Sequence, residues 1–195
     1  MPDIEPDELW VDLGSTEYAQ TTRGSSQIAL TGMPSTSNLQ YFTIQCDVYL
    51  TNSLATDFVL YDTENSYEAW RMRGYFTNAY PGFLAMTNNV TNWSASPSAP
   101  AVSAFKADGI YFQTCSSLFR NEEYTHFKIV FDRINKSGYI YANNVLIGCA
   151  TITEDPICID TITLTLEAGS KPAYTKNIKV AGFSTLDKAL AWNGE

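Results

Sequence analysis

The stretch from Thr125 to Gly148 alternates between apolar and polar residues in three short runs. Side chains along a β-strand point alternately to opposite faces, so this alternation predicts strands that turn one face to a core. In the first run the apolar face carries Phe127, Ile129 and Phe131. The opposite face, which we expect to meet water, carries His126, Lys128, Val130 and Asp132.

Two polar breaks separate the three runs and predict tight turns. Asn135–Gly138 interrupts the alternation first, and Asn143-Asn144 interrupts it again before Val145. Asparagine is one of the few residues besides glycine that tolerates a positive φ, so the Asn143-Asn144 pair suits a two-residue hairpin turn. The stretch is therefore predicted to form an antiparallel meander of three strands.

Similar short runs occupy the rest of the chain, between clusters of Gly, Ser, Asn and Pro. We predict strands at residues 9–13, 26–31, 40–50, 57–62, 68–76, 81–86, 109–115, 124–132, 138–142, 144–152, 157–166 and 175–183. Many short strands at this spacing are typical of a two-layer sandwich. The predicted fold class is therefore all-β.

One segment near the C-terminus has a helical pattern instead. Ser184–Asp187 has the form of an N-terminal capping box with Asp in place of Glu, and Lys188–Trp192 continues it before Asn193-Gly194. This pattern predicts a helix of about two turns. Residues 94–104 are small and contain proline, and we predict that they form a long loop.

Length and composition predict one domain with a short tail. A chain of 195 residues can bury one substantial core. Residues 1–8 contain four carboxylates and two prolines, which predicts a flexible acidic arm before a single sandwich domain at residues 9–195. This acidic start is also unlike a secretory signal, which is basic and then apolar.

The charge balance argues against two kinds of partner. Lys and Arg total 12 against 21 Asp and Glu, for a net charge of −9. Binding to nucleic-acid phosphates and docking on an anionic membrane both need clustered positive charge. No apolar run approaches the roughly 18–20 residues of a membrane span. We therefore expect neither nucleic-acid binding nor membrane insertion.

The cysteines show no spacing that is typical of a metal site. They are Cys46, Cys115, Cys149 and Cys158. Cys46 shares its alternation with apolar neighbours and is predicted to be a small core residue. We predict buried free thiols, while the short separation of Cys149 and Cys158 leaves a bridge between facing strands as the alternative.

Three segments together resemble the concanavalin A-like lectin/glucanase superfamily, and its LamG-like branch in particular. They are the meander with its FKIVFDR, YIYANN and VLIG runs, the early strand Tyr41–Leu50, and the closing strand and helix from Tyr174 to Leu190. The resemblance covers roughly a third of the chain, and such degenerate patterns support fold better than function. It implies a concanavalin A-like jelly-roll sandwich of two antiparallel sheets with one short C-terminal helix.

Two positions depart from the pattern of that family. Asn143-Asn144 stands where the family has Asp-Gly, and Lys176 stands where its last strand commonly has an acidic residue. Both departures weaken the case for the family's calcium site, and no loop carries a spaced ladder of oxygen ligands. We expect no cofactor and no metal site, with a structural calcium ion as the alternative.

The sequence contains no recognisable catalytic pattern. Glycoside hydrolases of the superfamily carry two Glu around an Asp on one strand face, and no E-x-D-x-E occurs here. Its polysaccharide lyases need a matched histidine, and the one histidine of this chain, His126, is interpreted as a surface or cross-strand residue. We therefore predict no catalytic residues and no enzymatic activity.

Better functional candidates lie between Phe58 and Trp93, where aromatic residues are interleaved with Asn and Arg. Sugar recognition uses flat rings that stack on C–H faces and polar groups that hydrogen-bond to hydroxyls. About half of these aromatics are expected to fill the core, whereas Tyr80 and Trp93 are predicted to lie in loops. The predicted glycan contacts are Trp93, Tyr80, Asn78, Asn89, Asn92, Arg71, Arg73 and Trp70.

These observations predict a non-enzymatic recognition or surface-display module, with carbohydrate binding first because the resemblance implies it. The alternative is a structural component of a bacteriophage virion, such as a capsid decoration or fibre module, which the acidic arm favours. A second alternative is a degenerate glycoside hydrolase or polysaccharide lyase. The expected partner is a glycan or a neighbouring protein subunit, with a homo-oligomer as an option. The resemblance favours a virion or extracellular surface.

Overall fold

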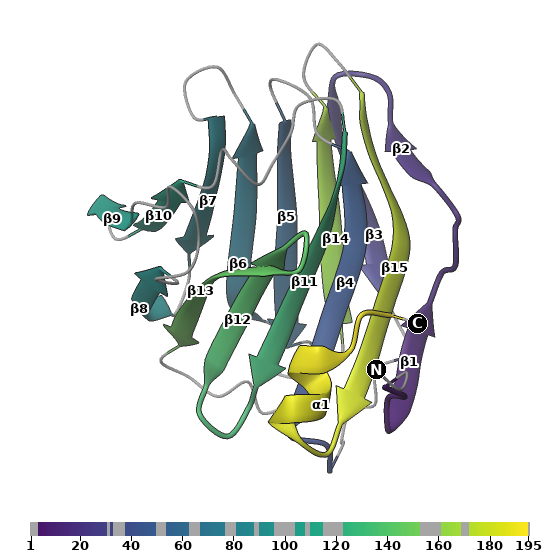
Figure 1. Cartoon of the computed structure of the whole chain (residues 1–195). Helices are drawn as coiled ribbons and strands as arrows, with labels where there is room; N and C mark the ends of the chain where they lie inside the picture. Colours follow the sequence, from purple (N-terminus) through teal and green to yellow (C-terminus); the bar gives the residue numbers. More distant parts are fainter. Residues whose placement is uncertain are drawn as a thin grey trace.

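The computed structural model shows two antiparallel sheets packed face to face, with a short helix on the outside (Figure 1). The structure describes residues 4–30, 32, 38–49, 54–62, 67–76, 81–87, 90–95, 104–107, 110–114, 123–152, 161–168 and 172–194. For residues 54–62, 67–76, 81–87, 90–95, 104–107, 110–114, 150–152, 161–165 and 167 it describes the backbone only.

The two sheets divide the chain between them. Sheet A has the strand order β1 (Glu8–Asp12), β15 (Ala173–Phe183), β4 (Tyr41–Tyr49), β11 (Tyr124–Asp132), β12 (Ser137–Ala142), β13 (Val145–Ile152) and β8 (Val90–Ala95), with β2 (Tyr18–Gln20) also paired to β15. Sheet B has the order β3 (Gly24–Leu30), β14 (Thr161–Ala168), β5 (Leu54–Asp62), β6 (Tyr67–Phe76), β7 (Pro81–Thr87), β10 (Ile110–Thr114) and β9 (Ala104–Ala107). The predicted all-β sandwich with a short C-terminal helix is confirmed.

Three strands were not apparent from the sequence. β2 is only three residues long, and β8 and β9 extend into the two ends of the segment predicted as a long loop at residues 94–104. The run VTNWSA of β8 is too polar to stand out as a strand, and it is extended because it pairs with β13. Pairing with a strand remote in sequence has here overridden local composition.

The core between the sheets is built on paired positions of β4 and β11. Phe131 pairs with Phe42, and Ile129 pairs with Ile44. None of these four side chains is more than 2% exposed, and the two phenylalanine rings lie 4.9 Å apart between centres. The predicted core face of the meander is confirmed.

Cys46 extends the same row and is fully buried as a free thiol, as predicted. Burial raises the pKa of this thiol to about 12, although a hydrogen bond with Thr175 acts in the opposite direction. Cys149 is half-buried and forms no disulfide, so the alternative of a bridge to Cys158 is not formed. Cys115 and Cys158 lie outside the described residues.

Most of the opposite face of β11 is buried, contrary to the prediction: Lys128, Val130 and Asp132 are buried, and only His126 is partly exposed. Helix α1 (Leu186–Ala191) lies across the outer face of sheet A, over β4, β11 and β15 (Figure 1). Val130 is buried there in a second small cluster, together with Ala181, Phe183, Ala189 and Trp192. Alternation shows that two faces of a strand differ in polarity, but it does not show that a remote helix covers the polar one.

Helix α1 begins one residue later than predicted. Thr185 is the N-cap, and its hydroxyl accepts from the backbone N–H of Lys188 at 3.4 Å. Thr43 of β4 holds the other end of the helix by donating its hydroxyl to the carbonyl of Ala189 at 3.1 Å. Six residues are too few to cross a membrane, and no other helix in the described ranges is long and apolar enough to do so.

Asp7 attaches the N-terminal segment to the helix and the sheet. Its backbone N–H donates to the carbonyl of Gly182 at 3.1 Å. Its carboxylate accepts from Lys188 Nζ at 2.8 Å and from the N–H of Ser184 at 2.6 Å. These hydrogen bonds, that of Lys188 foremost, lower the pKa of Asp7 to about 2. Asp7 and Glu8 were predicted to lie in the acidic arm, and the structure attaches both to the sandwich.

Lys128 is the residue whose environment differs most from the prediction, since its side chain is only 2% exposed. Its Nζ donates to the carbonyls of Leu190 at 2.8 Å and Trp192 at 3.2 Å, and to Asn193 Oδ1 at 3.4 Å. The last carbonyls of a helix have no partner within the helix and carry partial negative charge, so a buried ammonium suits them. Burial nevertheless lowers the pKa of Lys128 to about 8.

The second turn of the meander has the predicted geometry. Asn143 and Asn144 have φ values of 48° and 63°. Replacing Asn144 with valine should destabilise the protein by about 1–2 kcal/mol, because a β-branched residue does not adopt a positive φ without strain. Glycine at the same position should keep the free energy of unfolding within about 0.5 kcal/mol. Urea unfolding of the two variants measures the difference, and equal stabilities would contradict this account of the turn.

The burial of Lys128 predicts a stability that rises at alkaline pH. A pKa of about 8 in the folded state lies below the ordinary value of 10.5, so between these values the unfolded chain binds more protons. The free energy of unfolding of the wild type should therefore rise, relative to Lys128→Met, by up to about 3 kcal/mol as the pH increases from 8 to above 10. Urea unfolding across this range measures the difference between the two proteins, which removes the contribution of the tyrosines. A difference that stays constant or falls would contradict the prediction.

Candidate functional site

The residues predicted to contact glycan do not gather at one place. Those on β6, inside sheet B, are Trp70, Arg71 and Arg73. Those on β8, at the edge of sheet A, are Asn92 and Trp93. The remaining three, Asn78, Tyr80 and Asn89, lie outside the described residues. The loop predicted around Trp93 is instead strand β8, where Trp93 pairs with Ala150 of β13.

The register of sheet B separates the three candidates on β6. Arg73 pairs with Asp57 of β5, and positions two apart on a strand belong to the same face, so Arg71 and Arg73 share one. The position of Trp70 aligns across β5 and β14 with Leu30, which is 1% exposed in the core. The two arginine positions therefore lie on the outer face of sheet B, and that of Trp70 lies on the core side.

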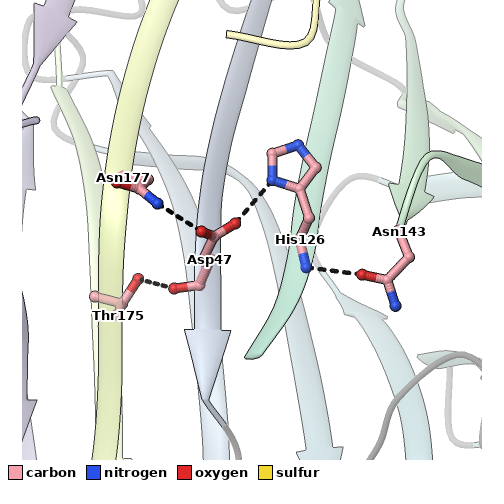
Figure 2. A network of polar contacts seen from close by, with 5 residues as sticks. All are labelled: Asp47, His126, Asn143, Thr175 and Asn177. Atoms are coloured by element: carbon pink, nitrogen blue, oxygen red, sulfur yellow. Dashed lines mark hydrogen bonds and ion pairs between the residues drawn. The ribbon is translucent and has the colours of Figure 1, made fainter. Parts of the chain in front are cut away.

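Among the residues whose side chains are described, polar groups concentrate on the outer face of sheet A. Figure 2 shows Asp47 on β4, between β15 on one side and β11 on the other. His126 of β11 is its cross-strand partner, with Nδ1 2.9 Å from Asp47 Oδ1. Asn177 of β15 donates its amide to Asp47 Oδ2 at 2.6 Å. One carboxylate is thus held from both neighbouring strands.

Backbone contacts fix the position of this pair. Thr175 donates its hydroxyl to the carbonyl oxygen of Asp47 at 2.9 Å. Asn143, in the hairpin turn, accepts from the backbone N–H of His126 at 3.0 Å and donates its own N–H to the carbonyl of His126 at 2.8 Å. Asn143 therefore has two roles: it forms the hairpin turn with a positive φ, and it holds the backbone of His126 in place.

The charge state of Asp47 is the balance of two opposing effects. Burial raises the pKa of a carboxyl, but hydrogen bonds from His126 and Asn177 and the charges of His126 and Lys176 outweigh it, so the pKa of Asp47 is lowered overall. The carboxylate faces Nδ1, so in a neutral imidazole the proton lies on Nδ1 and Nε2 is the acceptor. Nε2 is buried and has no hydrogen-bond partner.

Three tyrosine rings lie next to this polar cluster, at the end of the same strands. Tyr49 of β4 pairs with Tyr124 of β11 and with Tyr174 of β15. Its ring meets theirs edge to face, at 5.3 Å and 5.7 Å between centres. Lys176 Nζ lies 4.1 Å from the centre of the Tyr124 ring. Burial, followed by a hydrogen bond to Glu17, raises the pKa of Tyr124.

A hollow of ≈ 310 Å³ opens between the polar cluster and the C-terminal segment. Its lining residues are Gln45, Asp47, His126, Asn177, Lys179, Asn193 and Gly194. Gln45 is only 3% exposed, and its Oε1 has no hydrogen-bond partner. A hollow of this size, lined by amide, imidazole, ammonium and carboxylate groups, can hold a small polar molecule by hydrogen bonds.

The lining of the hollow contains one carboxyl group, that of Asp47. Glycoside hydrolysis uses two carboxyl groups across the bond that breaks, and the lining contains one. No group of three or more His, Cys, Asp and Glu side chains that could hold a metal ion occurs in the described ranges. The expectation of no cofactor and no metal site, with a structural calcium ion as the alternative, stays a prediction.

The sequence contains part of the signal for this cluster. Asp47 lies on the polar face of the strand predicted at 40–50, and His126 lies on the polar face of the strand predicted at 124–132. The interpretation of His126 as a cross-strand residue agrees with the structure. Its partner was missed because the pairing of β4 with β11, residues far apart in sequence, is set by the fold.

The sequence matches no protein-family model and no curated protein. The fold, in contrast, is similar to that of solved structures. A legume lectin-like domain from Entamoeba histolytica has a TM-score of 0.57 at 10% sequence identity, over 94% of this chain and 89% of that one. The galectin LEC-6 from Caenorhabditis elegans has a TM-score of 0.51 at 10% identity, over 85% of this chain and 95% of that one.

A sialidase also matches, with a TM-score of 0.57 at 9% identity. The match covers 85% of this chain but only 15% of the sialidase, so this chain corresponds to a small part of that enzyme. Likenesses at such low identity establish the fold alone. The chain has the broad lectin-like jelly-roll sandwich, as the sequence predicted.

The arrangement around Asp47 predicts a pH-dependent contribution to stability. Because the pKa of Asp47 is lowered on folding, the stability it confers is complete above the unfolded value near 4 and is lost as the pH falls through the folded value. Asp47→Asn should cost about 2 kcal/mol at pH 7, the usual loss for a hydrogen bond to a charged group, and much less at pH 2. The exposed Asp187→Asn serves as control. Urea unfolding at both pH values measures the loss, and an equal loss at each would contradict the assignment.

Proposed function

We propose that this protein is a carbohydrate-recognition module without catalytic activity. One observation carries the proposal: the outer face of sheet A places three tyrosine rings beside a polar hollow. Sugars combine C–H faces that pack against aromatic rings with hydroxyls that donate and accept hydrogen bonds. The likeness to lectin domains supports the same function as a fold-level analogy.

The outer face of sheet B is a second surface that this function could use. Arg71 and Arg73 hold neighbouring positions there, opposite Asp57 on the adjacent strand. Guanidinium groups donate to sugar hydroxyls, so the glycan contacts predicted from sequence remain part of the proposal for these two residues. Asn92 and Trp93, on edge strand β8, form a separate candidate.

Within the lectin-like fold, we propose that the meander belongs to the LamG-like branch. The resemblance of β11, β12 and β13 to that branch supports this finer placement, as does the short helix that follows the last strand. A homo-oligomer is likewise a proposal, since several copies would strengthen weak binding to a repeating glycan. Light scattering after size-exclusion chromatography measures the number of copies.

A glycan array tests the function and locates the surface. The wild type should bind a defined set of glycans, and Tyr174→Ala should reduce that signal about tenfold, as loss of one stacking ring does. Arg71→Ala/Arg73→Ala and Trp93→Ala are the matched variants for the other two surfaces. EDTA should leave the signal unchanged, because no cluster of metal ligands occurs among the described residues.

The results distinguish whether the protein binds glycan from which of its surfaces does so. Loss of signal in only one of the three variants identifies the surface that binds. Absence of any glycan signal from the folded wild type, confirmed as folded by circular dichroism, would contradict the proposed function.

A further inference from the structure

Three buried side-chain polar atoms in the described part of the chain have no hydrogen-bond partner, and two of them belong to residues that line the same hollow. They are Gln45 Oε1, His126 Nε2 and Trp192 Nε1. Leaving such a group without a partner costs about 1–3 kcal/mol, so native structures rarely do so without a reason. All three residues adjoin the C-terminal segment. Gln45 and His126 line the hollow together with Asn193 and Gly194, and Trp192 precedes those two residues.

Asn193 and Gly194 form a cover over one wall of the hollow. Gly194 lies so close to Gln45 that a Cβ atom on Gly194 would be 1.6 Å from Gln45 Nε2. Gly194 also has a φ of +85°, which favours glycine. The pair Asn193-Gly194 is called the cover.

The cover is held by hydrogen bonds from lysines and not by apolar packing. Lys179 Nζ donates to the carbonyl of Gly194 at 2.6 Å, and Lys128 Nζ lies 3.4 Å from Asn193 Oδ1. Asn193 is exposed and Gly194 is half-buried, whereas the preceding Trp192 is 2% exposed in the cluster beneath α1. Moving the cover therefore breaks polar contacts that water can replace, and the apolar cluster stays in place.

The unpaired atoms in the hollow define the chemistry of a ligand. Gln45 Oε1 only accepts, and His126 Nε2 accepts in the neutral imidazole, because Nδ1 carries the proton that faces Asp47. A ligand must then donate. Lys179 and Asp47 place one positive and one negative charge in the lining, so its charges balance. The hollow thus suits an uncharged molecule with several O–H groups better than an anion.

We propose that this hollow binds one neutral sugar unit, which displaces the cover and donates hydroxyl hydrogens to Gln45 Oε1 and His126 Nε2. The proposal rests on the proposed function and names its ligand class and its site. A volume of ≈ 310 Å³ lies at the small end of the range for ligand pockets, which fits a single ring. Trp192 lines a second hollow, of ≈ 250 Å³, together with Glu5, Pro6, Leu9, Lys179 and Gly194.

Gln45→Met gives the sharpest test, because it should move stability and binding in opposite directions. Methionine fills a similar volume and removes the unpaired acceptor, so the melting temperature should stay the same or rise. The same variant should bind sugar at least tenfold more weakly. Gln40→Met, at an exposed position, is the control and should change neither property. A Gln45→Met protein with lower stability and full binding would contradict the proposal.

Gly194→Ala tests the cover. The added Cβ cannot coexist with the Gln45 amide in its present position, so the cover should be displaced and sugar should bind about threefold more tightly. Gly14→Ala is the matched control, because Gly14 also has a positive φ, of +56°, and a Cβ there meets nothing within 4 Å. Weaker binding by Gly194→Ala than by Gly14→Ala would overturn the role of the cover.

Nuclear magnetic resonance on the whole chain locates the ligand. Glucose, galactose, mannose and N-acetylglucosamine are titrated into the ¹⁵N-labelled protein, alongside glucuronate and galacturonate. At least one neutral sugar should shift the Trp192 indole and Gly194 amide signals, and glucuronate and galacturonate should each bind at least tenfold more weakly than that sugar. Shifts confined to β6 or β8 would overturn this site and leave carbohydrate recognition standing. No shift with any sugar, together with a blank glycan array, would overturn both.

Discussion

The structure depends on how the C-terminal segment covers one strip of polar residues on the outer face of sheet A. This strip runs along β4 and β11 and includes Lys128, Gln45, Asp47 and His126. Lys128 and the end of α1 each need the other: an ammonium buried at 2% exposure needs acceptors, and the last carbonyls of a helix need donors. A buried charge without partners would cost several kcal/mol. Satisfying it places Trp192 over Val130 and Phe183, and this apolar cluster then fixes the helix against β4, β11 and β15.

The same constraint builds the candidate site. The C-terminal segment continues past Trp192 over the same face, where Asn193 and Gly194 border the hollow together with Asp47 and His126. One end of the strip is therefore covered by the apolar cluster around Trp192, and the other end carries the rings of Tyr49, Tyr124 and Tyr174. Between them the polar residues of three strands border a hollow. Scaffold and site are thus adjacent parts of a single face.

Alternation along the chain was enough to predict most strands of the fold, because each depends on the polarity of its own residues. Phe127, Ile129 and Phe131 identify a core face without any knowledge of the partner strand. Positive φ at Asn143 and Asn144 follows equally from local chemistry. The burial of Lys128 could not be predicted in this way. The sequence predicts that such a lysine is exposed to solvent. Its burial follows only from the carbonyls of Leu190 and Trp192, which accept its hydrogen bonds and are remote in sequence.

The site was harder to predict for the same reason. Aromatic, Asn and Arg residues lie close together in sequence between Phe58 and Trp93. The structure places the described candidates among them on two different sheets, on β6 and β8. The cluster that the structure does assemble joins residues remote in sequence, Asp47, His126 and Asn177, through pairing on both sides of β4. Sequence composition finds neighbours along the chain, whereas a sheet makes neighbours across it.

Gln45 and Asp47 lie two positions apart on the same face of β4. The carboxylate of Asp47 has hydrogen-bond partners and Oε1 of Gln45 has none, and this difference affects where the proposed ligand would bind. Both oxygens of Asp47 accept hydrogen bonds, so that group is already satisfied and a ligand gains little by replacing its partners. Gln45 Oε1 has none to lose, so a hydroxyl donated to it is a net gain. The satisfied carboxylate holds His126 in one orientation, and in the proposed complex the unsatisfied amide of Gln45 supplies free energy of binding. For the proposed ligand, a polar network that is complete around Asp47 and incomplete at Gln45 favours the covered end of the hollow.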